Sequence, residues 1–239
     1  MRYAIFDIET RIDKTLVNEV FFPQAGLSDD EALARFRDDL MREQGNDFPP
    51  LAFHIPISIA VGDVSADHKL CRVESLARDR YSERELVREF WERLERFDGC
   101  LVSFNGRRFD LPVLELQAFR HGIVCRSHFS ESGRRRRYDI ARHLDLHDFI
   151  TNYGAFRLRG GMHALLRMIG LPGKESMDGG KVQKLYEQGR LEEIHRYCRS
   201  DVIKTYFLFL RVQLIRGEIN EAQYNEAKQA SASFLDELV

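Results

Sequence analysis

The sequence predicts an α/β fold in which helices cover a mixed β-sheet. Three observations lead to this prediction. Short segments rich in β-branched and aromatic residues fill the first part of the chain, amphipathic helical segments lie between them, and the pattern beyond Leu158 is helical to the end. We expect a single domain over residues 1–239, because 44% hydrophobic residues are ample for one large core.

The first strand is expected at residues 2–8, a β-rich run that opens directly into the polar side chains of Asp7, Glu9 and Thr10. Residues 23–50 then differ in composition, with prolines at both ends of a polar helix. Its Ser28 and Glu31 fit a capping box. We interpret this segment as an insertion rather than as a separate domain.

Two strands are predicted next, at residues 54–64 and 69–75, and the residues between them suit a hairpin turn. The sheet must therefore contain antiparallel neighbours. A helix with one apolar face follows Ser82 and ends at Gly99, after which residues 100–104 form another strand.

The next helix begins near Phe109, carries Pro112 in its first turn and ends at Gly122, where a left-handed cap is expected. A further strand is predicted near residues 137–141. Glycines later in the chain predict helix ends at residues 170, 189 and 217, and the tail at residues 218–239 is a helix candidate without an evident role.

Composition excludes several classes of protein. The 36 basic and 38 acidic residues leave a formal charge of -2, unlike a chromatin-type binder, so any nucleic-acid surface must be local. Asp7 interrupts the position where a signal peptide needs an apolar core, and no apolar run is long enough to span a bilayer. The four cysteines form no CxxC pair, so we expect a cytoplasmic protein without a cysteine metal site.

Acidic residues stand at three structurally suggestive places. Asp7 and Glu9 are two residues apart on a strand, so their side chains leave the same face about 7 Å apart. Asp110 lies in the first turn of a helix that follows a strand, at the kind of sheet edge where α/β proteins place ligands. Tyr197 and Asp201 are four residues apart on a helix and share one face. Taken singly, each position is also explained by capping, solvation or chance.

Electrostatics connects these positions. Four carboxylates in one pocket would repel one another unless cations lay between them. A set of oxygen ligands without His or Cys indicates hard ions such as Mg²⁺ or Mn²⁺ rather than Zn²⁺. Two such ions would suit in-line displacement at a phosphodiester.

In order along the chain, residues 6–10, 105–110 and 197–201 resemble the three exonuclease motifs of the DEDD superfamily, in its tyrosine (DEDDy) subclass. Within that subclass the chain is most similar to stand-alone predicted exonucleases related to the exonuclease domain of family B DNA polymerases. The resemblance implies a ribonuclease H-like fold with a five-stranded mixed sheet flanked by helices. It also implies a 3′-5′ exonuclease that shortens single-stranded DNA and releases nucleoside 5′-monophosphates.

The motifs carry residue roles with them. The resemblance implies that two Mg²⁺ or Mn²⁺ ions are bound by the four motif acids, Asp7, Glu9, Asp110 and Asp201, and that Tyr197 orients or helps to deprotonate the attacking water. Contacts to nucleic acid are expected from residues near the first two motifs: Thr10, Asn105, Arg107, Arg108 and Phe109. The arginine run at residues 134–137 is a candidate for outer phosphate contacts. The polar residues between Asp139 and Asp148, and His195, are expected to have core or supporting roles.

Three alternatives remain open at this stage. The same fold could trim RNA or RNA–DNA hybrids, because metal chemistry at a phosphodiester does not itself distinguish the sugar. The chain could also bind single strands without cleaving them, or its acids could be purely structural. DNA 3′ ends are the favoured partner, together with an unidentified protein of repair or replication, and no membrane partner is expected.

Overall fold

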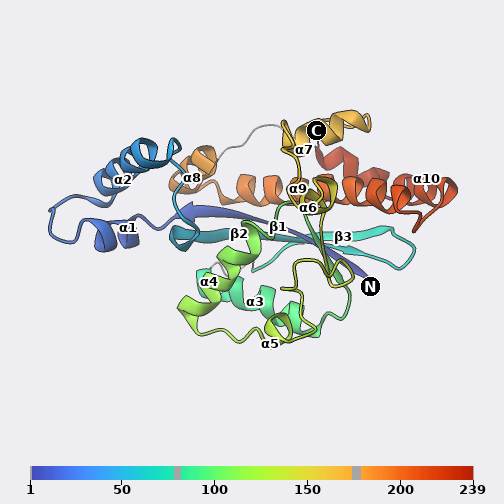
Figure 1. Ribbon diagram of the computed structural model, residues 1–239, viewed down its shortest axis with the longest axis horizontal. Helices are drawn as coiled ribbons and strands as arrows, with labels where there is room; N and C mark the ends of the chain where they lie inside the picture. Colours follow the sequence, from blue (N-terminus) through green and yellow to red (C-terminus); the bar gives the residue numbers. More distant parts are fainter. Residues whose placement is uncertain (1, 78–81, 174–178, 239) are drawn as a thin grey trace.

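The computed structural model describes residues 2–77, 82–173 and 179–238. A single β-sheet lies in the middle, with a long helix along one face and shorter helices on the other (Figure 1). The strands are β1 (Tyr3–Ile12), β2 (His54–Val64), β3 (Leu70–Ser75), β4 (Cys100–Ser103) and β5 (His143–Asp145).

The strand order is β3-β2-β1-β4-β5. Strand β2 pairs antiparallel with both β1 and β3, whereas β1 pairs parallel with β4 and β4 with β5. The predicted five-stranded mixed sheet, including its hairpin, is therefore confirmed. This is the ribonuclease H-like arrangement that the sequence motifs imply.

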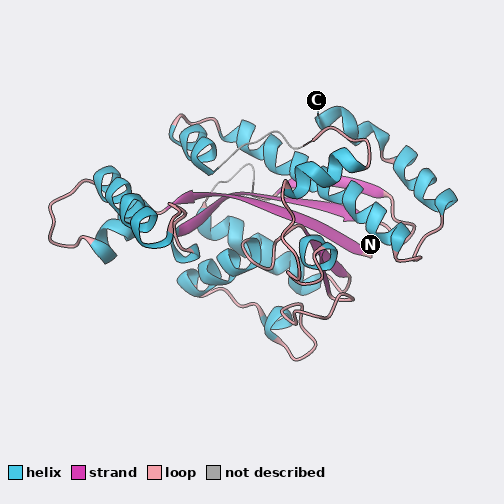
Figure 2. Cartoon of the chain, turned by 45° about the horizontal axis from the view of Figure 1, so that its top comes forward, coloured by secondary structure: helices cyan, strands magenta, loops and turns pink. Residues whose placement is uncertain are grey.

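Helices account for most of the remaining chain (Figure 2). They are α1 (Lys14–Phe21), α2 (Asp29–Gln44), α3 (Glu83–Arg96), α4 (Asp110–His121), α5 (Arg126–Phe129), α6 (Leu146–Ile150), α7 (Gly161–Met168), α8 (Gly179–Glu187), α9 (Leu191–Ile215) and α10 (Glu221–Ala230), with 3-10 turns at Leu51–Phe53 and Ala232–Leu238. The helical character predicted after Leu158 is confirmed.

Strand β1 contributes to both layers of the core because its side chains alternate between the two faces of the sheet. Tyr3 and Ile5 pack in the cluster that contains the apolar residues of α9. Phe6 and Ile8 pack in the cluster formed with α3 and α4. Asp7 therefore continues the face of β1 that is turned toward α9.

The segment at residues 23–50, interpreted above as an insertion, lies beyond one end of the sheet, at the left of Figure 1. Its Leu33, Phe36 and Leu40 form a small hydrophobic cluster with residues of β1, α1 and the 3-10 turn before β2. Its α2 begins with the predicted capping box, in which Ser28 and Glu31 exchange hydrogen bonds. The sequence did not predict α1, which begins where the Asp13 side chain accepts a hydrogen bond from the backbone N–H of Leu16 at 3.1 Å.

Two strand predictions need correction. Strand β1 continues past residue 8 to Ile12, because residues 9–12 pair with the start of β2. The register shifts between Glu9 and Thr10, where Ile57 of β2 is the extra residue of a bulge. The strand expected at residues 137–141 lies instead at His143–Asp145. The backbone before β5 is a turn, in which the N–H of His143 donates to the carbonyl of Asp139 at 3.1 Å.

None of the helices within the described residues is long and apolar enough to cross a membrane.

Candidate active site

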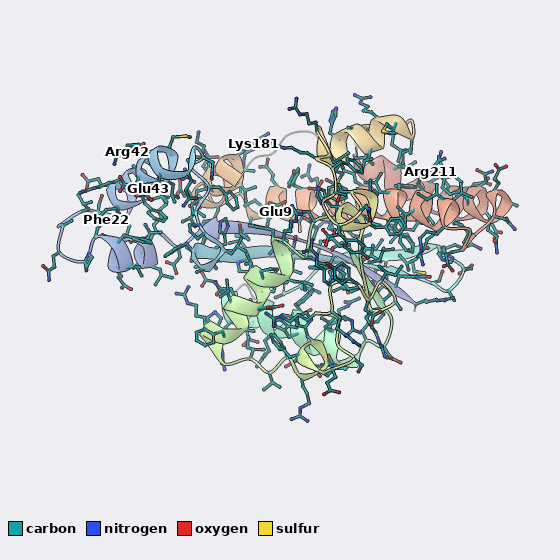
Figure 3. The ribbon with its side chains drawn as sticks, in the orientation of Figure 1. Glu9, Phe22, Arg42, Glu43, Lys181 and Arg211 are labelled. Carbon is teal, nitrogen blue, oxygen red and sulfur yellow. The ribbon has the colours of Figure 1, made fainter. Side chains whose placement is uncertain are left out.

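Three carboxylates from two distant elements meet beside the end of β1. Asp7 and Glu9 leave the same face of the strand, and Asp201 approaches them from α9. Each offers an oxygen within 4.8 Å of the oxygens of the other two. Figure 3 shows Glu9 near the middle of the molecule, between β1 and α9. We call these three residues the acidic cluster.

The acidic cluster fits a divalent cation by the chemistry of its donors. All three side chains supply hard oxygen ligands, the type that Mg²⁺ and Mn²⁺ prefer. Asp201 is fully buried, so its charge has lost the solvation that water would provide. Within the described residues this is the group of acids whose spacing could hold a metal ion.

Asp110, the fourth motif acid, reaches the same place from the first turn of α4. Its Oδ1 accepts a hydrogen bond from the backbone N–H of Ile8, between the two acids of β1, at 3.2 Å. Asp110 and Tyr197 line a cavity of about 520 Å³ together with Asp7 and Glu9. The structure therefore brings all five predicted catalytic residues to one site.

Helix α9 holds Tyr197 and Asp201 one turn apart, as the spacing predicts. Between them Cys198 is fully buried, and its Sγ donates to the carbonyl oxygen of Asp7 at 3.3 Å. Burial, with the nearby charges of Asp7 and Glu9, raises the pKa of the Cys198 thiol well above its ordinary value, so the side chain stays protonated. Cys198 is thus a packing residue that joins α9 to β1.

A lysine balances the buried charge of Asp201. Lys204, one turn further along α9, donates from Nζ to Asp201 Oδ1 at 3.2 Å and to Ser200 Oγ at 3.1 Å. Both side chains of the ion pair are almost completely buried. A divalent cation bound by the cluster would compete with this ammonium group for the Asp201 carboxylate.

Lys204→Met is expected to lower the free energy of unfolding by about 3 kcal/mol without metal, because it leaves a buried carboxylate with one donor fewer. Saturating Mn²⁺ should reduce this loss, since the ion no longer competes with an ammonium group. Urea unfolding with and without Mn²⁺ measures both effects. Lys184→Met, at an exposed position of α8, is the matched control. An equal loss of stability in both conditions would contradict the expected competition.

The turn between β4 and α4 is held by a residue outside the three motifs. Asn105 adopts a left-handed conformation, φ 67°, which asparagine tolerates better than most residues. The backbone N–H groups of Asn105 and Arg107 donate to the carboxylate of Asp145 at 2.9 and 2.8 Å. The same carboxylate caps α6. This confirms the supporting role expected for Asp145, one of the polar residues between Asp139 and Asp148. In the sequence, the sign of such a role is a carboxylate placed between a strand and a helix.

The predicted contacts to nucleic acid lie in three different places. Asn105, Arg108 and Phe109 line the cavity of the acidic cluster. The Oγ1 of Thr10 is instead hydrogen-bonded to the ring of His54 at 2.9 Å. Arg107 donates to the carbonyl oxygen of His143 at 2.7 Å and lines a second cavity.

An aromatic group borders the site on the side of the insertion. The ring of Phe109 lies 5.1 Å from that of His54 and 5.9 Å from that of Phe48, measured between centroids. Phe48 is 52% exposed and belongs to the segment at residues 23–50. The insertion thus extends the aromatic surface that begins at Phe109.

Sequence reasoning did not place three residues that also line the cavity, Phe104, His147 and Met162. It also misjudged Arg134, which is buried rather than available for phosphate. Its guanidinium donates to the carbonyl oxygens of Leu94, Phe97 and Gly99 and so satisfies the end of α3. His195, whose supporting role was predicted, is buried with Nδ1 2.9 Å from Ser58 Oγ.

Comparison with known proteins finds a matching family and similar solved structures. Residues 46–238 match the model of a family described as predicted 3′-5′ exonucleases related to the exonuclease domain of PolB. This match begins after the first acidic pair. Among solved structures, the family B DNA polymerase from the hyperthermophilic archaeon Pyrobaculum calidifontis is similar over 90% of this chain, with 19% identity and a TM-score of 0.56.

The polymerase match is limited in what it supports. At 19% identity it supports the fold alone, and the matched region covers 24% of the polymerase chain. The match to the exonuclease family covers most of the present chain and contains Asp110, Tyr197 and Asp201.

Proposed function

The chain belongs to the family of predicted 3′-5′ exonucleases related to the exonuclease domain of PolB, and on this basis we propose that it shortens single-stranded DNA from the 3′ end. The products are nucleoside 5′-monophosphates and a strand with a new 3′ hydroxyl. The observation that carries the proposal is the convergence of Asp7, Glu9 and Asp201 within 4.8 Å, at a cavity that Asp110 and Tyr197 also line.

The residues that would hold the metal are the three acids of the cluster together with Asp110. Two Mg²⁺ or Mn²⁺ ions, when bound, supply positive charge that stabilises the developing charge on the attacking and leaving oxygens. The protein supplies a rigid arrangement of ligands, since β1 and α9 pack against each other through the main core. Lys204 compensates Asp201 when no cation is bound.

Tyr197 is the chain's candidate for handling the attacking water. Its side chain lines the cavity and lies one helical turn from Asp201, so its hydroxyl can hold a water molecule by hydrogen bonding beside the acids. Attack by that water on phosphorus breaks the bond to the 3′ oxygen of the preceding nucleotide. The 3′ oxygen leaves with the shortened strand and takes up a proton.

Single-stranded ends suit the groups around this cavity. Phe109 and the exposed Phe48 beside it offer ring surfaces for base stacking, which is tolerant of sequence. Arg108 and Asn105 offer donors for phosphate oxygens next to the acids. We propose that residues 1–239 act as one exonuclease domain, in which Phe48 is the part of the insertion that contributes to strand binding. The setting we propose is the trimming of DNA ends in repair.

The proposal is tested with matched DNA and RNA oligonucleotides in Mg²⁺ or Mn²⁺. A strand labelled at its 5′ end should give a ladder of progressively shorter products, and a strand labelled at its 3′ end should release labelled mononucleotide at once. EDTA should stop both reactions. Internal products at early times, or release of mononucleotide from the 5′ end, would contradict the proposal. Faster shortening of RNA than of DNA would replace the DNA assignment by the exoribonuclease alternative.

A further inference from the structure

A second cavity of about 350 Å³ lies beside the acidic cluster and carries no role in the reaction described above. It is bounded by the turn before α4, one face of α4, the loop at residues 130–142 and α6. Arg108 lines this cavity and the cavity of the acidic cluster. Both cavities therefore border the same arginine.

Positive charge dominates the second cavity. Arg107, Arg108, Arg135 and Arg137 contribute four guanidinium groups to its lining, against the two carboxylates of Glu115 and Asp148. Arg135 lies 3.3 Å from Glu115 and Arg137 lies 3.6 Å from Asp148, yet the arginine side chains remain 63% and 49% exposed. Arg108 makes no side-chain hydrogen bond or ion pair within the described residues. Once the two acids are balanced, two positive charges remain to attract an anion.

Asp148 adds a different requirement. Its side chain is 96% buried, and neither carboxylate oxygen accepts a hydrogen bond from the described residues. Leaving a buried acceptor without a donor is unfavourable, and a ligand carrying N–H or O–H groups would recover the lost free energy. A ligand for this cavity thus combines negative charge with hydrogen-bond donors. A nucleotide meets both conditions, through its phosphate and through its base or sugar.

We propose that the second cavity binds an internal nucleotide of the same single strand whose 3′ end lies at the acidic cluster. The inference rests on the proposed function, because it assigns this surface to the same substrate. Arg108, which both cavities share, contacts the backbone between the two bound nucleotides. Arg135 and Arg137 bind the phosphate of the inner nucleotide, and Asp148 accepts from its base or sugar. The site would hold the strand in place while the terminal nucleotide is removed.

The test compares a 12-nucleotide DNA strand with the p-nitrophenyl ester of thymidine 5′-monophosphate, which is too small to reach both cavities. In the Arg135→Ala/Arg137→Ala variant, KM for the strand should rise roughly tenfold, with kcat little changed. The slope of log KM against log salt should fall by about 1, because at least one phosphate contact is lost. Hydrolysis of the ester should stay within about twofold of the wild type.

Two further variants separate binding from folding. Arg42→Ala/Arg88→Ala removes the same charge from exposed positions on α2 and α3 that line neither cavity, and Figure 3 shows Arg42 far from Glu9. This control should leave both substrates unaffected. Asp148→Asn, which keeps the shape of the side chain, should raise KM for the strand alone.

The inference is wrong if Arg135→Ala/Arg137→Ala leaves the kinetics of both substrates unchanged, or slows hydrolysis of both equally. It is also wrong if thymidine 5′-monophosphate inhibits the wild type but not the variant while KM for the strand is unchanged, because the cavity would then bind free nucleotide. Should the wild type cleave neither substrate, the proposed function fails separately. Fluorescence anisotropy of a labelled strand would still test whether the second cavity binds the strand. In that measurement the Arg135→Ala/Arg137→Ala variant must bind roughly tenfold more weakly than the wild type.

Discussion

Asp7→Ala is expected to abolish shortening of single strands, with a loss in kcat of at least about a thousandfold, or ~4 kcal/mol. Asp7 supplies one of the oxygens of the acidic cluster, and no other acid on β1 can replace it there, because Glu9 already occupies the next position on that face. The fold should survive, since removing one acid relieves like-charge repulsion in the metal-free protein. The ladder assay with a 5′-labelled strand measures the loss, and urea unfolding measures stability.

Two comparisons make this result specific. Asp38→Ala removes the same charge from an exposed position of α2 and should leave the ladder unchanged. Tyr197→Phe keeps every acid and loses one hydroxyl, so it should slow hydrolysis less severely than Asp7→Ala does. A variant Asp7→Ala that gave the wild-type ladder would show that the acidic cluster is not the catalytic site.

Asp145→Ala is expected to have the largest effect on stability, with a loss of about 3–5 kcal/mol in the free energy of unfolding. The carboxylate accepts four backbone hydrogen bonds, from Asn105, Arg107, His147 and Asp148, at 2.9, 2.8, 3.0 and 3.2 Å. Hydrogen bonds to a charged acceptor are stronger than neutral ones, and their loss leaves buried donors unsatisfied. For a chain of this size the melting temperature should fall by about 10 °C.

Activity should fall with stability in this variant, because the turn held by Asp145 carries Asn105, Arg108 and Phe109 to the cavity and starts α4 at Asp110. Thermal unfolding and the ladder assay are measured on the same preparation. Asp139→Ala serves as the control, since its carboxylate accepts a local hydrogen bond from Ala141 at 3.2 Å and should matter little. If Asp145→Ala melted like the wild type, the proposed anchoring of the turn would be wrong.

The parts of the fold that were predicted from the sequence are those with strong local signals. The long strand at His54–Val64 is buried along its whole length and matches the predicted bounds. The capping box of α2 and the left-handed Gly122 after α4 were also predicted, because each is fixed by the chemistry of a few neighbouring residues.

The errors arise where distant contacts override local patterns. Strand β5 has three residues, and pairing with β4 selects them rather than the run at residues 137–141. Residues 9–12 follow the predicted end of the first strand, and only their pairing with β2 makes them part of β1. Arg134 cannot be distinguished from its three neighbouring arginines by sequence, because it differs from them only in its tertiary contacts. Its guanidinium donates to carbonyl oxygens at the end of α3 and in the residues that follow.

The candidate site was predictable to the extent that it is encoded in motifs. Spacing placed Asp7 with Glu9 and Tyr197 with Asp201, and the structure brings both pairs together. The bond between Thr10 and His54 and the anchoring by Asp145 depend on tertiary contacts that no local pattern contains. The second cavity is likewise invisible in the sequence, since its lining comes from four separate segments.

Because β1 and α9 stand at opposite ends of the chain, a growing polypeptide can display Asp7 long before Asp201 has been synthesised. Contacts between such distant segments form late, after the intervening chain has folded. Under the proposed function, the nuclease site is therefore completed only after α9 has been synthesised and has packed against β1.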